Sequence, residues 1–133
     1  MRLLLVLVSW CLVSHSYAIE QDISKRYLGK YAKSAKECQS SSFVTLFAKT
    51  IKLTNGEFSV QLSGIDHCYS CEGGARYSGK VVWLFPEFGT QSPSRAMFTL
   101  NHNEQQGKLG VILKDPVLAS SMGFTEAVLL KCL

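Results

Sequence analysis

Cys68 and Cys71 form the arrangement in this chain that most resembles a chemical centre. A Cys-x-x-Cys spacing serves either a thiol–disulfide redox reaction or a local disulfide, and the redox reaction needs a thiolate stabilised at a helix N-terminus. Glu72, Gly73 and Gly74 follow the pair. Glycines disfavour a helix, and a carboxylate disfavours a thiolate beside it. The sequence therefore favours a structural disulfide, and a redox enzyme centred on Cys68 and Cys71 is the alternative.

His67 directly precedes the cysteine pair and is the second candidate for chemistry. A hydrolytic triad would need an activated serine and an orienting acid beside it, but no serine lies in a nucleophile-elbow pattern. The nearby carboxylates, Asp66, Glu72 and Glu87, are expected to be ordinary surface acids. A zinc site needs about four suitably spaced ligands, and the sequence has no second Cys-x-x-Cys or His pair. The pattern predicts no catalytic residue, no metal site and no cofactor, with a hydrolase using His67 kept as an alternative.

The five cysteines divide according to how the chain is expected to be processed. Residues 1–18 have a positive start, an apolar stretch and a small residue at Ala18, which is the pattern of a secretory signal peptide cleaved after that residue. Cleavage removes Cys11 and leaves an even number of cysteines, which indicates two disulfides in a small exported chain. No later stretch is long or apolar enough to span a bilayer. We expect a secreted or periplasmic protein without stable membrane insertion.

The four remaining cysteines allow three pairings, and the sequence does not choose strictly among them. We favour Cys38–Cys132 together with Cys68–Cys71. The first bridge would join the start of the domain to its last strand and close a long loop, which contributes about 4 to 5 kcal/mol in the chain-entropy model. The second would be a local clip across the Cys-x-x-Cys motif.

The elements that must position these residues are predicted to be strands. Alternating apolar and polar residues, or short apolar runs rich in β-branched residues, indicate strands. These segments are residues 27–31, 43–53, 58–63, 81–85, 96–101, 109–113 and 127–132. Asn55-Gly56 lies between two of them and predicts a hairpin with a type I′ turn, because both residues tolerate positive φ. Residues 64–79 are expected to be a loop, and residues 117–124 one helical turn or an irregular loop.

Seven or eight short strands separated by turns predict an all-β fold, namely a small antiparallel β-barrel or sandwich with two disulfides. No repeat or linker divides residues 19–133, so we expect a single domain. A hydrophobic content of 47% argues against intrinsic disorder. The formal net charge of +4 is small and dispersed, and it does not indicate nucleic acid as a partner.

A short stretch after the cysteine pair resembles the c-type lysozyme inhibitor family. Residues 73–77 (Gly-Gly-Ala-Arg-Tyr), followed by Val-Trp at 82–83, are similar to the signature of that family. The resemblance implies a small exported bacterial protein with an antiparallel barrel, a disulfide and a lysozyme as its partner. Gly73 stands where the family has Ser, and residues 84–87 (Leu-Phe-Pro-Glu) stand where it has a Lys-Gly turn. The two polar contacts that carry inhibition in that family are therefore missing.

The sequence favours an exported, non-enzymatic binding or inhibitor module that uses the disulfide-clipped, glycine-rich loop of residues 66–78. A loop stiffened by a disulfide loses less entropy on binding, and Tyr69, Arg76 and Tyr77 are residue types that anchor interfaces. The expected partner is a protein such as a lysozyme, or a small apolar ligand inside the barrel. The alternative is a small exported redox or hydrolytic enzyme centred on Cys68 and Cys71 or on His67.

Overall fold

The computed structural model describes residues 21–88 and 94–133. The expected signal peptide, its cleavage site and Cys11 lie outside the described residues. The elements, with η for a 3-10 helix, are η1 (Lys25–Tyr27), β1 (Gly29–Ala32), η2 (Lys36–Gln39), β2 (Ser42–Leu46), β3 (Ile51–Asn55), β4 (Phe58–Leu62), β5 (Asp66–Cys68), β6 (Val82–Phe85), β7 (Ala96–Leu100), η3 (His102–Glu104), β8 (Lys108–Leu113), α1 (Pro116–Met122) and β9 (Glu126–Lys131).

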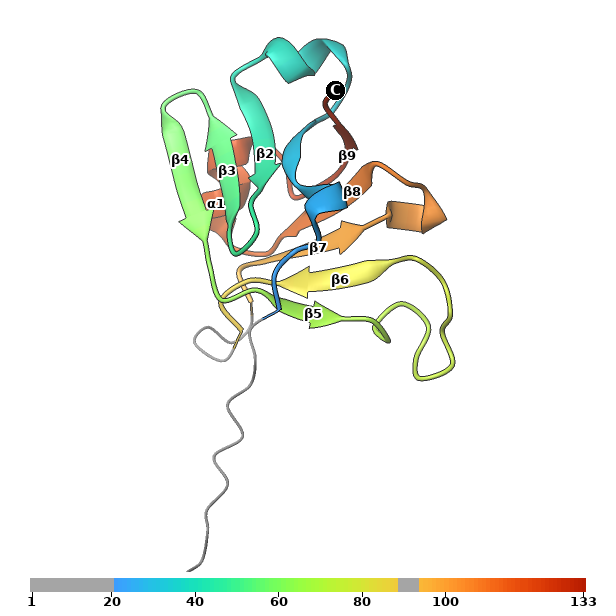
Figure 1. The fold of residues 1–133 in the computed structure, drawn as a ribbon. Coiled ribbons are helices and arrows are strands. Elements are labelled where there is room, and N and C mark those ends of the chain that lie inside the picture. Colours follow the sequence, from blue (N-terminus) through green and yellow to red (C-terminus); the bar gives the residue numbers. More distant parts are fainter. Residues whose placement is uncertain (1–20, 89–93) are drawn as a thin grey trace, which may run out of the picture.

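The described residues form one nine-stranded antiparallel sheet that curls into a half-barrel (Figure 1). The strand order is β4-β3-β2-β1-β9-β8-β7-β6-β5, so all paired strands are consecutive in the chain except β1 and β9. Strands β4 and β5 are consecutive in the chain but form the two edges of the sheet. The barrel is therefore open between them. The predicted all-β, antiparallel class is confirmed.

Two segments explain why the sheet has nine strands and not the seven or eight that were expected. The run 43–53 forms two strands, because the chain turns back at residues 47–50, where the Phe47 amide donates to the Thr50 carbonyl at 2.9 Å. Strand β5 lies inside the glycine-rich segment that was expected to be a loop, and it pairs with β6.

The β3–β4 hairpin is confirmed, but its turn lies one residue later than expected. Asn55 pairs with Phe58, so the two loop residues are Gly56 and Glu57. Of these two, Gly56 has the positive φ, at 60°. A positive φ at the first loop position belongs to a type II′ turn and not to the expected type I′ turn.

The concave side of the sheet is filled by a packed core. Tyr31 and Phe98 are among its largest fully buried side chains. Helix α1 contributes Leu118 and Met122 to the same core. The interior considered above for a small apolar ligand is therefore occupied by the protein's own side chains.

Helix α1 forms in the segment expected to be one helical turn or an irregular loop. The Asp115 side chain accepts a hydrogen bond from the Val117 amide at 2.8 Å and caps the first turn, with Pro116 at a first-turn position. Gly123, in the left-handed conformation at φ 79°, ends the helix. None of the helices formed by the described residues is long and apolar enough to cross a membrane.

Both favoured disulfides are present. Cys38 on η2 is bonded to Cys132, which follows β9, and their Cα atoms are 5.7 Å apart. Cys68, at the end of β5, is bonded to Cys71, with a Cα–Cα distance of 5.6 Å. The first bridge lies next to the β1–β9 junction, where the Cys132 amide also donates to the Lys30 carbonyl at 2.8 Å.

Candidate functional site

A row of side chains runs across the outer, convex face of the sheet. The strand register aligns Cys68, Trp83, Thr99, Gly110 and Val128, one residue from each of the strands β5 to β9. Side chains alternate between the two faces of a sheet, and the residues on either side of Gly110 point into the core. The row therefore faces away from the core.

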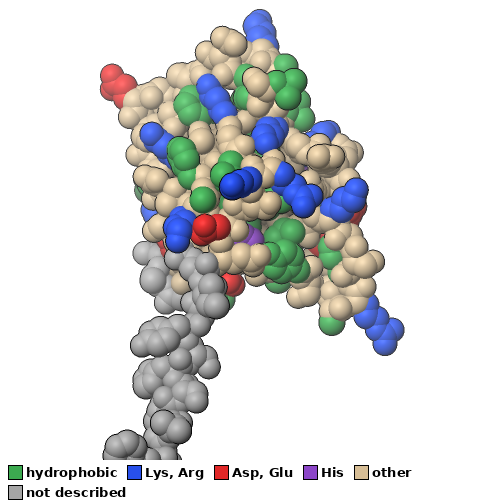
Figure 2. Space-filling model, in the orientation of Figure 1, with side chains coloured by type: hydrophobic (Ala, Val, Ile, Leu, Met, Phe, Trp, Pro, Cys, Tyr) green, Lys and Arg blue, Asp and Glu red, His purple; other side chains and the backbone are tan. Residues whose placement is uncertain are grey.

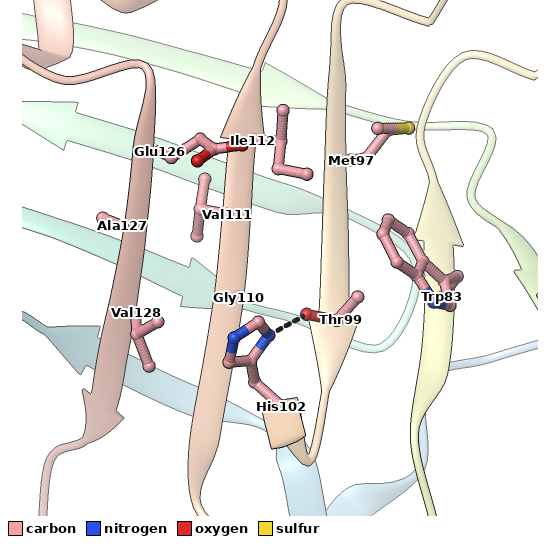
Figure 3. Close-up of a pocket in the computed structure, with 10 residues that line it drawn as sticks. All are labelled: Trp83, Met97, Thr99, His102, Gly110, Val111, Ile112, Glu126, Ala127 and Val128. Carbon is pink, nitrogen blue, oxygen red and sulfur yellow. Dashed lines mark hydrogen bonds between the residues drawn. The ribbon is translucent and has the colours of Figure 1, made fainter. Parts of the chain in front are cut away.

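The middle of this row is hollowed into a groove of about 280 Å³ (Figure 3). Trp83 lies on one side of the groove and Val128 on the other. Met97 and Ile112, which are paired in the adjacent row, also line the groove. The lining is mainly apolar, with Glu126 toward one end. We call this feature the outer groove.

Gly110 leaves room for a hydrogen bond between two side chains that line the outer groove. A Cβ at this position would overlap Thr99 Oγ1 and His102 Nδ1. These two atoms lie 2.9 Å apart in a hydrogen bond across the glycine. A larger residue would have to break this bond or fill the groove.

Trp83 is held in place by the disulfide-clipped loop. Its indole Nε1 donates to Glu72 Oε2 at 2.8 Å. Its ring is stacked on that of Phe85, with the two planes 15° apart and the centroids 6.2 Å apart. Cys68 is directly opposite Trp83 in the strand register. The clipped loop, which projects beyond the sheet in Figure 1, is therefore coupled to the wall of the outer groove.

The predicted binding residues of the loop lie in different environments. Tyr69 is 52% exposed and stacks on His67, with 6.2 Å between the ring centroids. Arg76 lies in an exposed turn. Tyr77 is partly buried, and its hydroxyl donates to Glu104 and accepts from the Val81 amide at 3.1 Å. Tyr69 and Arg76 are thus available to a partner, whereas Tyr77 holds the base of the loop.

Desolvation and the hydrogen bond to Glu104 raise the pKa of the Tyr77 hydroxyl. The same hydrogen bond, together with one from the Lys80 amide at 2.8 Å, lowers the pKa of Glu104. Gly79 is needed beside them, because a Cβ there would overlap Tyr77 and Glu104. The Tyr77 hydroxyl is consequently a protonated structural donor near neutral pH.

The redox alternative gains no support from the surroundings of the cysteine pair. Cys71 is followed by turn residues and does not begin a helix, whereas a helix N-terminus is what commonly stabilises a reactive thiolate. His67 pairs with Leu84 in the register and lines the inner side of the sheet, opposite to Cys68. The imidazole therefore faces away from the disulfide.

His67 is nevertheless unusual within residues 21–88 and 94–133. Its Nδ1 is buried and has no hydrogen-bond partner there. Burial lowers the pKa of His67 from 6.5, and the charge of Asp66 opposes this shift. The imidazole is therefore neutral near pH 7.

The three carboxylates near the glycine-rich loop do not share one site, and Asp66 is exposed on β5, opposite Phe85 in the register. Glu72 accepts from Trp83, whereas Glu87 forms a two-pronged ion pair with Arg95, at 2.8 Å and 2.5 Å. This ion pair lowers the pKa of Glu87. Glu72 and Glu87 thus have separate structural partners.

The sequence analysis did not predict the outer groove, although the sequence contains a pattern that marks this surface. Met97, Ile112 and Val128 are apolar residues at positions that alternate with the core-facing ones. Outward-facing apolar residues on three adjacent strands, with Gly110 among them, mark a surface that a partner can cover.

Comparisons with protein families, with curated proteins and with solved structures returned no match to this chain. The similarity to c-type lysozyme inhibitors therefore stays a hypothesis based on residues 73–83.

Proposed function

We propose that this protein is an exported, non-enzymatic binding module that recognises a protein partner through the outer groove. The observation that carries the proposal is an apolar groove in which Trp83 is fixed by Glu72. Tryptophan in a well-packed pocket is the residue type most often found at the energetic centre of an interface. Two disulfides among the described residues agree with an oxidising compartment outside the cytosol.

The size of the groove favours an anchoring side chain as its occupant. Pockets that enclose small molecules usually have volumes of about 300–1,000 Å³. The outer groove, at about 280 Å³, is at the lower end of that range, and it is an open, mainly apolar depression on a sheet face. A large apolar side chain presented by a partner's surface fits such a depression, while the surrounding sheet supplies the rest of the contact.

The charge beside the groove adds a requirement for the partner. Glu126 lines the groove, is exposed and has no ion pair within the described ranges. A basic residue next to the apolar anchor would pair with it. We therefore expect a partner that presents a large apolar side chain beside a Lys or Arg, with the exposed Arg76 available for a contact nearer the clipped loop.

The proposal is tested with two matched substitutions. Val128 lines the groove and is 43% exposed, whereas Val117, on α1, lies outside it and is 68% exposed. Both residues would be changed to Lys, which adds the same charge at two exposed positions. The wild-type protein and the two variants are immobilised and used to capture partners from the exported fraction of the producing cells.

We expect the protein captured by the wild type to be retained by Val117→Lys and lost by Val128→Lys. Titration of the purified partner should also change the fluorescence of Trp83 in the wild type. Equal capture by both variants, or equal loss, would exclude the outer groove as the binding surface.

A further inference from the structure

A second cleft lies at the end of the sheet where η1 meets the loops before β6 and after β7. It has a volume of about 300 Å³ and is lined by Arg26, Tyr27, Lys80, Asn101 and Gln106. Polar and apolar atoms contribute to its surface about equally, in contrast to the outer groove. Two of the five lining residues are cationic and none is acidic. We call this feature the basic cleft.

Asn101 holds the walls of the basic cleft together. It is 6% exposed and has a left-handed backbone conformation, at φ 53° and ψ 45°, which Asn tolerates better than most residues. Its side-chain amide donates to the Tyr27 hydroxyl and to the Lys80 carbonyl, each at 2.9 Å. Three segments distant in sequence are thus joined at one buried side chain, so the cleft is preorganised.

The two cationic side chains of the cleft form no ion pair with the described residues. Within residues 21–88 and 94–133, the ion pairs involve Lys49 and Arg95, and neither Arg26 nor Lys80 takes part in one. The Arg26 guanidinium lies over the Tyr27 ring, 5.6 Å from its centroid. Its hydrogen-bonding edges are therefore open to a ligand.

The neighbouring charges strengthen the positive potential at this end of the sheet. The Lys131 ammonium donates to the Arg26 carbonyl at 2.6 Å, which brings a third cation close to η1. A carboxylate also lies nearby: Glu104 accepts from the Tyr77 hydroxyl and the Lys80 amide, and its negative charge interacts with Lys80. The three cations Arg26, Lys80 and Lys131 outnumber this one acid at the end of the sheet. On the face drawn in Figure 2, Lys and Arg side chains dominate the charged groups.

We propose that the basic cleft binds a small polyhydroxylated anion through a carboxylate or phosphate group. Arg26 would hold two oxygens of this group with its planar fork of donors, and Lys80 would add a point charge. The cleft exceeds the size of a lone ion, and the amide of Gln106 can bond to hydroxyl groups of the same ligand. This proposal does not depend on the outer groove or on the proposed function.

Three sugars that differ in one group test the proposal. Glucuronate carries a carboxylate, glucose 6-phosphate carries a phosphate, and glucose carries neither. Each is titrated into the isotope-labelled protein, and the shifts of the Gln106 side-chain amide and of the backbone amides of residues 101–107 are followed. The variants are Arg26→Gln, Lys80→Gln and, as a control with the same loss of charge at an exposed position outside the cleft, Lys114→Gln.

We expect at least one charged sugar to give saturable shifts and glucose to give none. Arg26→Gln and Lys80→Gln should each weaken that binding by at least about tenfold, and Lys114→Gln by less than about twofold. The better-bound charged sugar identifies the group as carboxylate or phosphate. The proposal fails if neither charged sugar binds saturably, if glucose binds equally well, or if Lys114→Gln weakens binding as much as Lys80→Gln.

Discussion

Removal of the Cys38–Cys132 disulfide should cost this protein much more stability than removal of Cys68–Cys71. The bridged residues are 94 positions apart in the first case and 3 in the second. In the chain-entropy model these separations correspond to about 4.7 kcal/mol and about 2 kcal/mol of unfolding free energy. We therefore expect the double variant Cys38→Ser/Cys132→Ser to lose roughly 2 to 3 kcal/mol more than Cys68→Ser/Cys71→Ser.

The structure adds a reason for the size of the first effect. Strands β1 and β9 join the two halves of the sheet through only two register pairs, Tyr31 with Lys131 and Ala32 with Leu130. The neighbouring β8–β9 pairing has five. Without the disulfide, these two register pairs would be the strand pairing that joins the two halves, next to the contacts through the common core. Hydrogen exchange in the first variant should accelerate at residues 30–32 and 130–132 before it does so elsewhere.

Urea denaturation followed by circular dichroism measures both variants against the wild type. A loss of stability lowers the urea concentration at the midpoint, and any change in the slope is included when the free energies of unfolding are compared. Equal losses in the two variants, or a greater loss for Cys68→Ser/Cys71→Ser, would show that loop closure does not govern stability here.

The remaining predictions concern processing of the chain, the pH dependence of its stability, and its activity. The intact mass of the exported protein should correspond to a chain that begins at Ile19 and has no alkylatable thiol without reduction. Since burial lowers the pKa of His67 below 6.5, the unfolded state takes up the proton of His67 first as the pH falls. The free energy of unfolding should therefore decrease from pH 7.5 to 5.5, and His67→Gln should reduce that decrease. A His67 pKa of 6.5 or more in an NMR titration would contradict this prediction. The protein should not catalyse insulin reduction, and turnover that disappears in Cys68→Ser/Cys71→Ser would support the redox alternative. It should inhibit c-type lysozyme weakly or not at all, and potent inhibition would show that Gly73 does not prevent inhibition.

The strands and disulfides were accessible from the sequence because local patterns determine them. Alternation located β4, β7 and β8. The pairing of Cys38 with Cys132 was favoured among three possible ones because these residues lie near the two ends of the domain, and it is confirmed. Strand β5 was missed since its three residues lie among glycines and are stabilised by pairing with β6. The helical content of α1 was underestimated because only two of its residues, Leu118 and Met122, are buried, which is too few for a clear apolar pattern. Its ends are marked instead by the capping residues Asp115 and Gly123.

The candidate sites were less accessible because they depend on register and on contacts between distant segments. The outer groove requires Trp83, Gly110 and Val128 to align across the sheet, which no single stretch of sequence reveals. The basic cleft requires Asn101 to contact Tyr27, 74 residues earlier in the chain. The loop residues were recognised by type, but the structural role of Tyr77 arises from its partner Glu104.

The strand order also has a consequence for the kinetics of folding. Seven of the eight strand pairings join strands that are consecutive in the chain, and only β1 with β9 joins distant ones. Local hairpins close with little loss of loop entropy and can form early, so β1–β4 and β5–β9 can each assemble as separate meanders. The two meanders meet only through β9, so their docking must wait until this strand is in place. Before that, β1–β4 and β5–β8 are two separate sheets, and the core lacks Leu129 between them.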